Sequence, residues 1–595
     1  MKFGTELTRT GVRFRLWAPQ CDAITLRLEA AEPVDLAMTK LPRGWFELEV
    51  EGAGAGTRYR YILPDGLAVP DPASRFQPED VHGPSEVIDP RAYPWRDQGW
   101  RGRPWEETVF YELHVGTFTE EGTYNAAIEK LDYLAGLGIT AIELMPLADF
   151  DGRWNWGYDG VLHFAPDSTY GRPEELKALV DAAHERDLMV FLDVVYNHFG
   201  PSGNYMAMYT PLTTGKHETP WGASINYDDE GSLVIRDFVF ANAKYWLNEF
   251  HLDGLRFDAV HAIEDNGPRH LLQDMAEHLR GATDGRHVHL VAENADNEAG
   301  WLTRRDDLTT KLDTAQWSDD IHHALHCAST GESFGYYADF AGRLDLLGRA
   351  LAEGLAYQGE YSQFEEKEKG EPSAFLPATA FVSYIQNHDQ TGNRPMGERL
   401  HMIAPHQAVR AVAAINLLSP HIPLLFMGEE WAADQPFTYF SDISELADSI
   451  RKGRQREFAE SPLKKPGESM PDPMGEETFR ACKLDWAAQG DPEKAEWLSF
   501  YRRLLDVRRA EITPRLPEME GNSGSYQLID NRVLKVRWTL ADDAVLTLVA
   551  NLTPEPAVGV ELRAGRRLWL EGDLDGNTLS PWSVAFSLHD GQRGN

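Results

Sequence analysis

The feature that most constrains the fold is a series of eight short apolar segments, alternating with amphipathic helical stretches from about residue 106 onward. This alternation is typical of parallel βα units, and nearly continuous apolar composition fits strands that are buried on both faces. Eight such units spread over about 400 residues predict a (β/α)8 TIM barrel. The predicted strands are Val109–His114, Thr140–Met145, Met189–Val194, Gly254–Asp258, Val288–Glu293, Asp313–Trp317, Phe381–Gln386 and Pro423–Met427. The helices predicted between them include Asn125–Leu137, Glu174–Arg186, Val234–Phe250 and Pro268–Arg280.

Short strands of alternating polarity occupy both ends of the chain. In residues 1–90, segments such as VRFRLWAP and GWFELEV are separated by Gly, Pro and Asp turns, which predicts an antiparallel β-sandwich. Residues 513–595 show the same pattern and predict a C-terminal β-sandwich. A Pro- and Trp-rich connector, Asp89–Trp105, follows the N-terminal domain. The barrel domain is therefore assigned to residues 91–512, with a helix over Ala495–Arg509 that closes it. The predicted fold class is multidomain α/β.

Charge and cysteine content exclude several kinds of partner. The net charge of −37 argues against nucleic acid, because phosphate binding needs clustered cations. Cys21, Cys327 and Cys482 form no CxxC pair, so neither a disulfide framework nor a zinc site is predicted.

The most apolar long window, 411–427, is interrupted by polar residues and prolines, which predicts a buried helix and strand rather than a membrane span. With no signal-peptide pattern, we expect a cytoplasmic protein without a membrane partner or a cofactor.

Polar residues gather at the ends of the predicted strands, where barrels of this class carry their functional groups. The segment DGLRFDAVH, Asp253–His261, places Arg256 and Asp258 on one face of a strand. A nearby cation favours an ionised carboxylate, which can act as a nucleophile, although a structural ion pair would have the same sequence. His261 lies just beyond the same strand, and the other strand ends contribute Asp193, Asn197, His198, Glu293, His388 and Asp389.

Three of these carboxylates, Asp258, Glu293 and Asp389, are expected to converge on one rim. A divalent metal site is an alternative, but Arg256, two residues before Asp258, opposes metal binding, and no metal ligand is assigned. Glycoside hydrolysis instead needs one ionised carboxylate and one protonated carboxyl. We therefore expect Arg256 to keep Asp258 ionised, and partial burial after an apolar strand to raise the pKa of Glu293, which then acts as acid and base.

Four motifs resemble, in order, those of the α-amylase superfamily of glycoside hydrolases and transglycosidases: DVVYNH (193–198), GLRFDAVH (254–261), VAEN (291–294) and YIQNHDQ (384–390). The resemblance implies that Asp258 is the nucleophile that forms a covalent β-glucosyl intermediate, with retention of the anomeric configuration. It implies that Glu293 is the general acid/base and that Asp389 binds sugar hydroxyls and favours ring distortion.

The same resemblance implies residues that bind the substrate. Tyr158, in NWGYDG, is similar to an aromatic residue that stacks under the sugar, although core packing is its alternative. The substrate-binding candidates are Arg256, His198, His388, Tyr158, His261, Asp193 and Tyr439. The insertion Phe199–Gly231 is short compared with many α-amylases, which argues against the calcium site that the family carries there. Asn197 is therefore interpreted as a structural rim residue rather than a metal ligand. The charged segment Gly359–Pro372 is predicted to be a solvated loop.

The N-terminal β-domain and YELHVGTFT (111–119) narrow the resemblance to the branch with branching enzymes, isoamylases and maltooligosyltrehalose trehalohydrolases. The last family is the most similar, through NWGYDGV, APDSTYGRPEEL, VAENADN, QNHDQTGNR and PFTYFSD (436–442). It implies hydrolysis of the α-1,4 bond next to the terminal trehalose of maltooligosyl trehalose. The loop Phe437–Asp442 would then help to build a wall for trehalose, unless its aromatic residues only pack beneath it.

Two other functions remain open at the level of sequence. A branching enzyme would use the same double displacement with a glucan hydroxyl as acceptor, but such enzymes typically carry a second Glu where this chain has Asn294. A glucan-binding protein without activity would not need the complete carboxylate set, since binding alone requires no acid with a raised pKa.

Overall fold

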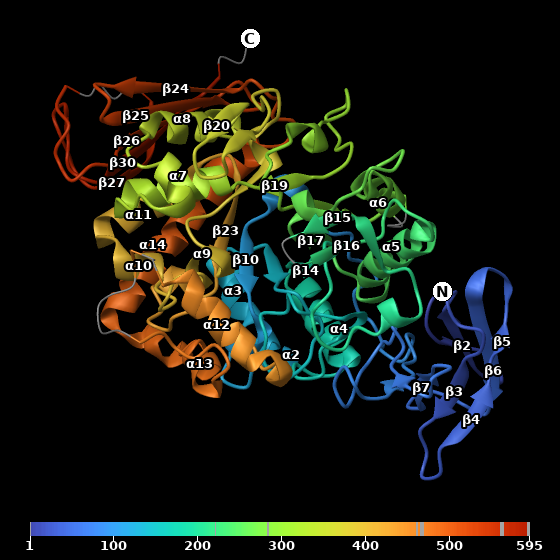
Figure 1. Ribbon diagram of the computed structural model, residues 1–595. Coiled ribbons are helices and arrows are strands. Elements are labelled where there is room, and N and C mark those ends of the chain that lie inside the picture. The colour runs from blue at the N-terminus through green and yellow to red at the C-terminus, as the bar shows by residue number, and fades with distance from the viewer. Residues whose placement is uncertain are drawn as a thin grey trace.

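The computed structural model describes residues 2–219, 222–281, 285–459, 462–463, 469–559 and 565–591. Eight parallel strands close into a barrel at the centre of the molecule (Figure 1), which confirms the predicted fold class. In barrel order these strands are β10 (Phe110–Leu113), β11 (Ala141–Leu144), β14 (Met189–Val194), β17 (Gly254–Phe257), β18 (His289–Ala292), β19 (Ala315–Trp317), β22 (Phe381–Ser383) and β23 (Ile422–Phe426). Pairing of Phe110 with Leu424 joins the first strand to the last.

The amino end of the barrel is a packed apolar core. Trp105, from the connector before β10, packs against inward-facing residues of several strands, and its indole N–H donates to the Thr379 carbonyl at 2.7 Å. A Cβ at Gly254 would lie 2.1 Å from the Phe191 ring and 2.6 Å from the His289 carbonyl oxygen, so a side chain there would clash with both neighbouring strands. Because the interior of the barrel is filled at this end, the polar groups that share that interior lie toward the carboxyl ends of the strands.

The helices surround the barrel. The longer ones are α4 (Pro173–His184), α5 (Ser232–Glu249), α6 (Leu271–Arg280), α7 (Asp319–Thr330), α8 (Leu344–Glu353), α11 (His406–Leu418), α12 (Ala447–Glu457) and α14 (Pro492–Val507). The helix predicted over Asn125–Leu137 is divided into α2 (Tyr124–Ile128) and α3 (Leu131–Leu137). The Lys130 N–H bonds to the Ala127 carbonyl three residues back, and this tighter turn interrupts the α-helical ladder. Within the described residues, no helix has the length and apolar character needed to cross a membrane.

Antiparallel sheets lie at opposite ends of the molecule, blue at the N-terminal end and red at the C-terminal end of Figure 1. The N-terminal sheets contain β1 (Glu6–Leu7), β2 (Gly11–Trp17), β6 (Trp45–Glu51) and β5 (Thr39–Lys40), and β4 (Val34–Ala37), β3 (Thr25–Leu28), β7 (Arg58–Ile62) and β8 (Ala68–Val69). The C-terminal sheet contains β24 (Gly524–Ile529), β25 (Val533–Thr539), β26 (Val545–Asn551), β30 (Ser583–His589) and β27 (Arg566–Glu571). The antiparallel domains are thus confirmed, whereas the boundaries at residues 90 and 512 stay predictions, and residues 1 and 592–595 lie outside the described residues.

The segment predicted as the solvated loop Gly359–Pro372 contains a short hairpin, β20 (Glu360–Ser362) paired with β21 (Lys367–Lys369). Its turn is joined to the second strand by an ion pair between Lys369 and Glu365 at 2.6 Å. This charged segment therefore forms a pair of short strands at the surface rather than a loop without regular structure.

The start of β17 is fixed by a buried polar group. The Asp253 carboxylate accepts the Trp100 indole N–H at 2.7 Å and lies 3.0 Å from His184 Nε2. The other nitrogen of His184 lies 3.0 Å from Asp97, so this imidazole bridges the connector and the barrel. These contacts anchor the amino end of the strand that carries Arg256.

Candidate active site

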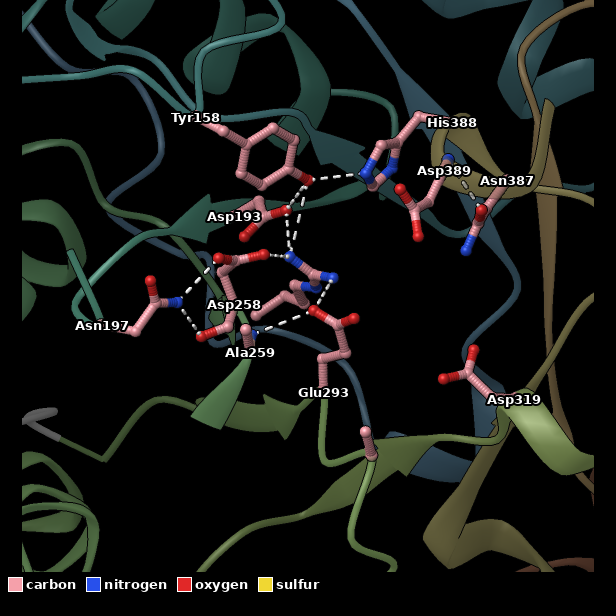
Figure 2. A network of polar contacts seen from close by, with 12 residues as sticks. Tyr158, Asp193, Asn197, Asp258, Ala259, Glu293, Asp319, Asn387, His388 and Asp389 are labelled. Carbon is pink, nitrogen blue, oxygen red and sulfur yellow. Dashed lines mark hydrogen bonds and ion pairs between the residues drawn. The ribbon is translucent and has the colours of Figure 1, made fainter. Parts of the chain in front are cut away.

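The site is organised around the guanidinium of Arg256, which is 2% exposed at the carboxyl end of β17. Its Nη1 donates to Asp193 at 2.6 Å and to Asp258 at 2.9 Å, and its Nη2 donates to Glu293 at 2.6 Å. Figure 2 shows Asp193, Asp258 and Glu293 gathered around one guanidinium, which these hydrogen bonds identify as that of Arg256. The guanidinium also lies over the Trp317 ring, 4.5 Å from its centroid, so one cation is held by three acids and an aromatic face.

Strand register explains this convergence. Asp193 on β14 pairs with Arg256 on β17, and Arg256 pairs with Val291 on β18. Side chains two residues apart share a face, so Asp258 and Glu293 follow their strands on the inward side. Neighbouring strands thus bring the charged groups together although they lie far apart in the sequence.

The three carboxylates singled out from the sequence line one cavity of about 620 Å³ at this end of the barrel. All the predicted substrate-binding residues except Asp193 line it as well, and Asp193 lies beneath it in contact with Arg256 and Tyr158. The cavity is lined by Asn155, Trp156, Tyr158, Asp159, His198, Phe199, Pro201, Arg256, Asp258, Ala259, His261, Glu293, His388, Asp389, Asn393, Tyr439 and Arg454. This volume lies in the range typical of small-molecule sites.

Asp258 and Glu293 are held by backbone and amide donors as well as by Arg256. The Asn197 amide donates to Asp258 Oδ2 at 2.8 Å and also to the Asp258 carbonyl at 2.8 Å. Ala259 has a φ of 39°, in the left-handed region that costs a non-glycine residue conformational energy. In this conformation its N–H donates to Glu293 Oε2 at 3.0 Å.

His388, Tyr158 and Asp193 form a polar chain that ends at Arg256. The His388 backbone N–H donates to Glu112 at 3.0 Å, and its Nδ1–H donates to the same carboxylate. Its Nε2 lies 2.9 Å from the Tyr158 hydroxyl, which in turn donates to Asp193 at 2.6 Å. Burial lowers the pKa of His388, but the Glu112 carboxylate outweighs this effect and holds the pKa above its usual value. Glu112 thus fixes which nitrogen faces the site and favours the charged imidazole.

A neutral carboxyl lies next to this chain in the barrel interior. Glu143 pairs in register with Glu112 and is 1% exposed. Neither of its carboxyl oxygens has a hydrogen-bond partner, and burial raises its pKa well above the usual value. Protonation of Glu143 limits the negative charge that Arg256 has to balance.

The expected pKa values of the two central carboxyls were wrong in direction. Burial raises the pKa of Asp258 to about 6, against the opposing effect of Arg256. Burial also acts to raise the pKa of Glu293, but Arg256 and the Ala259 N–H outweigh it and hold this pKa below its usual range. In the sequence Arg256 is close to Asp258 only, whereas in the fold its contact with Glu293 is shorter than its contact with Asp258. The two carboxyls therefore titrate as a pair.

The remaining predicted residues lie around the cavity. Asp389 accepts the Asn393 amide at 2.6 Å, and burial raises its pKa. His198 Nε2 lies 2.9 Å from the Tyr158 carbonyl, and His261 accepts the Ala295 N–H at 3.2 Å. Tyr158 stacks on His388, with ring centroids 5.2 Å apart.

Sequence reasoning missed part of the site. Glu112 lies on a buried strand, where a charged residue amid apolar neighbours was a usable signal. Asn197, interpreted as a structural rim residue, contacts Asp258 directly. Asn393 and Arg454 come from irregular or peripheral segments, and no spacing in the sequence indicated them. Among the residues described, no group of three or more His, Cys, Asp or Glu side chains could hold a metal ion, and Arg256 occupies the space between the carboxylates.

Comparison with known proteins gives consistent matches. Residues 89–213 match the family model described as alpha amylase, catalytic domain, and residues 521–586 match a domain of unknown function, DUF3459. The malto-oligosyltrehalose trehalohydrolase of Saccharolobus solfataricus is 43% identical, covering 89% of this chain and 90% of its own length. That of Deinococcus radiodurans is 46% identical, covering 84% and 81%.

Two further matches help to separate fold from function. The crystal structure of a candidate alpha amylase from Salmonella typhimurium has a TM-score of 0.94 and 44% identity, with 99% of both chains covered. A 1,4-alpha-glucan branching enzyme of Vibrio cholerae is 35% identical but covers only 42% of this chain and 38% of its own length.

The Arg256→Met variant tests the dependence of the site on one cation. We expect its free energy of unfolding to fall by about 3–5 kcal/mol at neutral pH, because the buried Asp193 and Asp258 and the half-buried Glu293 lose their shared partner. Burial raises the pKa of Asp193 to about 7 and that of Asp258 to about 6, so the folded state binds protons more tightly than the unfolded state. Stability therefore decreases as pH rises through this window, more steeply without the guanidinium.

Thermal unfolding at about pH 5 and about pH 8 measures the effect, and the deficit should be larger at the higher pH. Arg456→Met, at an exposed arginine, is the control and should behave like the unsubstituted protein. A deficit of equal size at both pH values would contradict the shared-cation account.

Proposed function

This chain belongs to the malto-oligosyltrehalose trehalohydrolase family, and on that basis we propose that it hydrolyses the α-1,4-glucosidic bond next to the terminal trehalose of maltooligosyl trehalose. The products are trehalose and a shortened maltooligosaccharide. The observation that carries the proposal is that Asp258 and Glu293 bind neighbouring nitrogens of one guanidinium and face the same cavity.

The first step transfers the glucan to the enzyme. The Asp258 carboxylate attacks the anomeric carbon, the bond to the leaving oxygen breaks, and Glu293 gives its proton to that oxygen. Trehalose leaves with this proton, and a covalent glycosyl–Asp258 ester remains. The Asn197 amide and Arg256 hold the attacking carboxylate in place, which lowers the entropic cost of reaching the transition state.

The second step reverses these roles. The Glu293 carboxylate takes a proton from water, the hydroxide attacks the anomeric carbon, and the Asp258 carboxylate is released. Two inversions give retention of configuration, which requires two carboxyl groups about 5–5.5 Å apart. Binding of both carboxylates to one planar guanidinium supports this short separation.

The other cavity residues bind the sugar at the cleavage point. Asp389 offers an acceptor to sugar hydroxyls, and the Tyr158 ring offers an apolar face. The two ring nitrogens of His388 are engaged by Glu112 and Tyr158, so its charged imidazole places a positive charge beside the sugar. His198 and His261 line the same wall of the cavity. We assign these roles by the match of each residue to the motifs of the superfamily.

The binding surface for trehalose continues beyond the carboxylates. Tyr439 and Arg454 line both the catalytic cavity and an adjoining hollow of about 450 Å³, which is also lined by Arg451 and Phe458. Arg454 lies over the Tyr439 ring, 5.4 Å from its centroid. This rigid aromatic and cationic wall supports a site for the disaccharide leaving group.

The branching reaction is not favoured, since the matching branching enzyme shares less than half of either chain. A cytoplasmic location is supported by the three cysteines, which are all buried free thiols, as suits a reducing compartment.

Product analysis tests the function. With maltotriosyl trehalose we expect free trehalose and maltotriose, and with amylose no new α-1,6 branches. Asp258→Asn should reduce turnover by about 10⁴-fold or more, because the nucleophile is lost while its shape is kept. Asp132→Asn, at an exposed position, is the matched control. Full turnover by Asp258→Asn would exclude the nucleophile assignment. Branched products would show that the enzyme transfers glucan chains instead of hydrolysing the bond.

The pH dependence of kcat/KM follows from the shared proton. Catalysis needs one proton on the Asp258–Glu293 pair, and the profile depends on this number rather than on which carboxyl carries it. Asp258 has the higher pKa of the two, about 6, and the pKa of Glu293 lies below its usual range. We therefore expect kcat/KM to fall above about pH 6, approaching tenfold per pH unit. A constant kcat/KM between about pH 6 and pH 9 would contradict this account.

The Tyr439→Ala variant tests the wall for trehalose. We expect kcat/KM for maltotriosyl trehalose to fall relative to that for maltopentaose by roughly 2–10-fold, the value of a lost aromatic contact. Tyr439→Phe keeps the ring and should retain most of the preference. An unchanged substrate ratio in Tyr439→Ala would show that this ring only packs beneath the loop.

A further inference from the structure

A second cavity, of about 560 Å³, lies at the amino end of the barrel, opposite the active site. Its inner wall includes Trp105 and the residues His289 and Thr314, at the starts of two strand segments, and its outer wall is formed by 516–521, the segment before the C-terminal sheet. The volume is typical of small-molecule sites, which often lie between domains. The reaction proposed above makes no use of this cavity.

Two arginines on the wall of this cavity converge on one residue. Arg280, at the end of α6, has its Nη2 3.4 Å from the Thr314 hydroxyl, and Arg304 Nη2 donates to the Thr314 carbonyl at 2.7 Å. Their other contacts are also to uncharged groups, the carbonyls of Leu312 and Leu302. Neither guanidinium forms an ion pair with a carboxylate in the described part of the chain.

Adjacent like charges without an anion are unfavourable in a half-buried site. Burial, followed by the charge of Arg280, lowers the pKa of Arg304 to about 10, and burial also lowers the pKa of Arg280. Arginine nevertheless stays protonated in proteins. Glu106 and Asp313 both act on Arg304, and Asp313 also acts on Arg280, but neither acid forms an ion pair with these arginines in the described residues. Burial raises the pKa of Asp313 to about 7, so it balances the two cations only in part.

The mouth of this cavity is apolar on one side. Phe375 is 47% exposed and Leu308 is 38% exposed, although both are large hydrophobic residues on the cavity wall. An exposed aromatic face beside a cationic wall fits a ligand that has both an anionic group and a ring. The carboxylates at the rim, including those of Glu518 and Glu520, disfavour an extended polyanion.

We propose that this cavity binds a small phosphorylated metabolite, with its phosphoryl group between Arg280 and Arg304 and its ring on Phe375. Guanidinium groups bind phosphate oxygens through charge-assisted hydrogen bonds, and here they have no competing carboxylate partner in the described residues. A phosphorylated sugar and a nucleoside monophosphate share this chemistry, and the experiment separates them.

The test measures binding to the full-length protein by calorimetry and thermal unfolding at constant ionic strength. The probes are inorganic phosphate, glucose 6-phosphate, adenosine monophosphate and glucose, which reports any binding at the active-site cavity. We expect one of the two ring-bearing phosphates to bind more tightly than inorganic phosphate. Arg304→Gln and Arg280→Gln should each weaken it roughly tenfold or more, whereas the exposed Arg456→Gln should not.

A second variant keeps the test decisive if an arginine substitution prevents folding. Phe375 is half-exposed, so Phe375→Ala removes little of the core and should fold. It should weaken binding of the ring-bearing phosphate and leave binding of inorganic phosphate unchanged. No binding of any phosphate at about 10 mM, or equal affinity in Phe375→Ala and the unsubstituted protein, would overturn the proposal. The proposal would also be overturned if a folded Arg304→Gln or Arg280→Gln variant bound the ring-bearing phosphate as tightly as the unsubstituted protein does.

Discussion

The structure depends on one buried guanidinium that is shared by three carboxylates. Arg256 contacts Asp193, Asp258 and Glu293 and stacks on Trp317, with almost no exposure to solvent. Burying this many charges is costly unless each is paired and hydrogen-bonded, so the surrounding barrel must hold every partner in place. The packed amino end and the polar anchor at the start of β17 provide this rigidity. The site is therefore organised before any sugar enters it.

Sharing one cation among several acids also determines where protons reside. Asp258 and Glu293 compete for the same guanidinium, so the pKa of neither carboxyl follows from the residues that precede it in the sequence. Glu112 adds a negative charge that is balanced by His388, and Glu143 avoids adding another by staying protonated. Both steps of a double displacement require one proton on the central pair, so in the active form the pair contributes a single negative charge beside Arg256.

The two ends of the barrel have different chemistry. At the carboxyl end, acids outnumber cations and surround one arginine, which suits stabilisation of a positively charged, oxocarbenium-like transition state. At the amino end, Arg280 and Arg304 lie beside each other without an acidic ion-pair partner among the described residues, which suits an anion. This separation places two cavities of opposite character on one scaffold, with the apolar barrel core between them.

The sequence by itself determined the barrel, its eight strands and the identity of the carboxylates, because strand burial and spacing by two residues are local properties. It also indicated the family, through motifs that each lie within a few residues. Only the tertiary structure decided how Arg256 is divided between Asp258 and Glu293, since that depends on the register of β17 and β18. The contact of Asn197 with Asp258 and the meeting of Arg280 with Arg304 likewise arise from packing between distant segments. Electrostatic energies depend on distance and burial in space, and neither quantity is encoded in any single stretch of the chain.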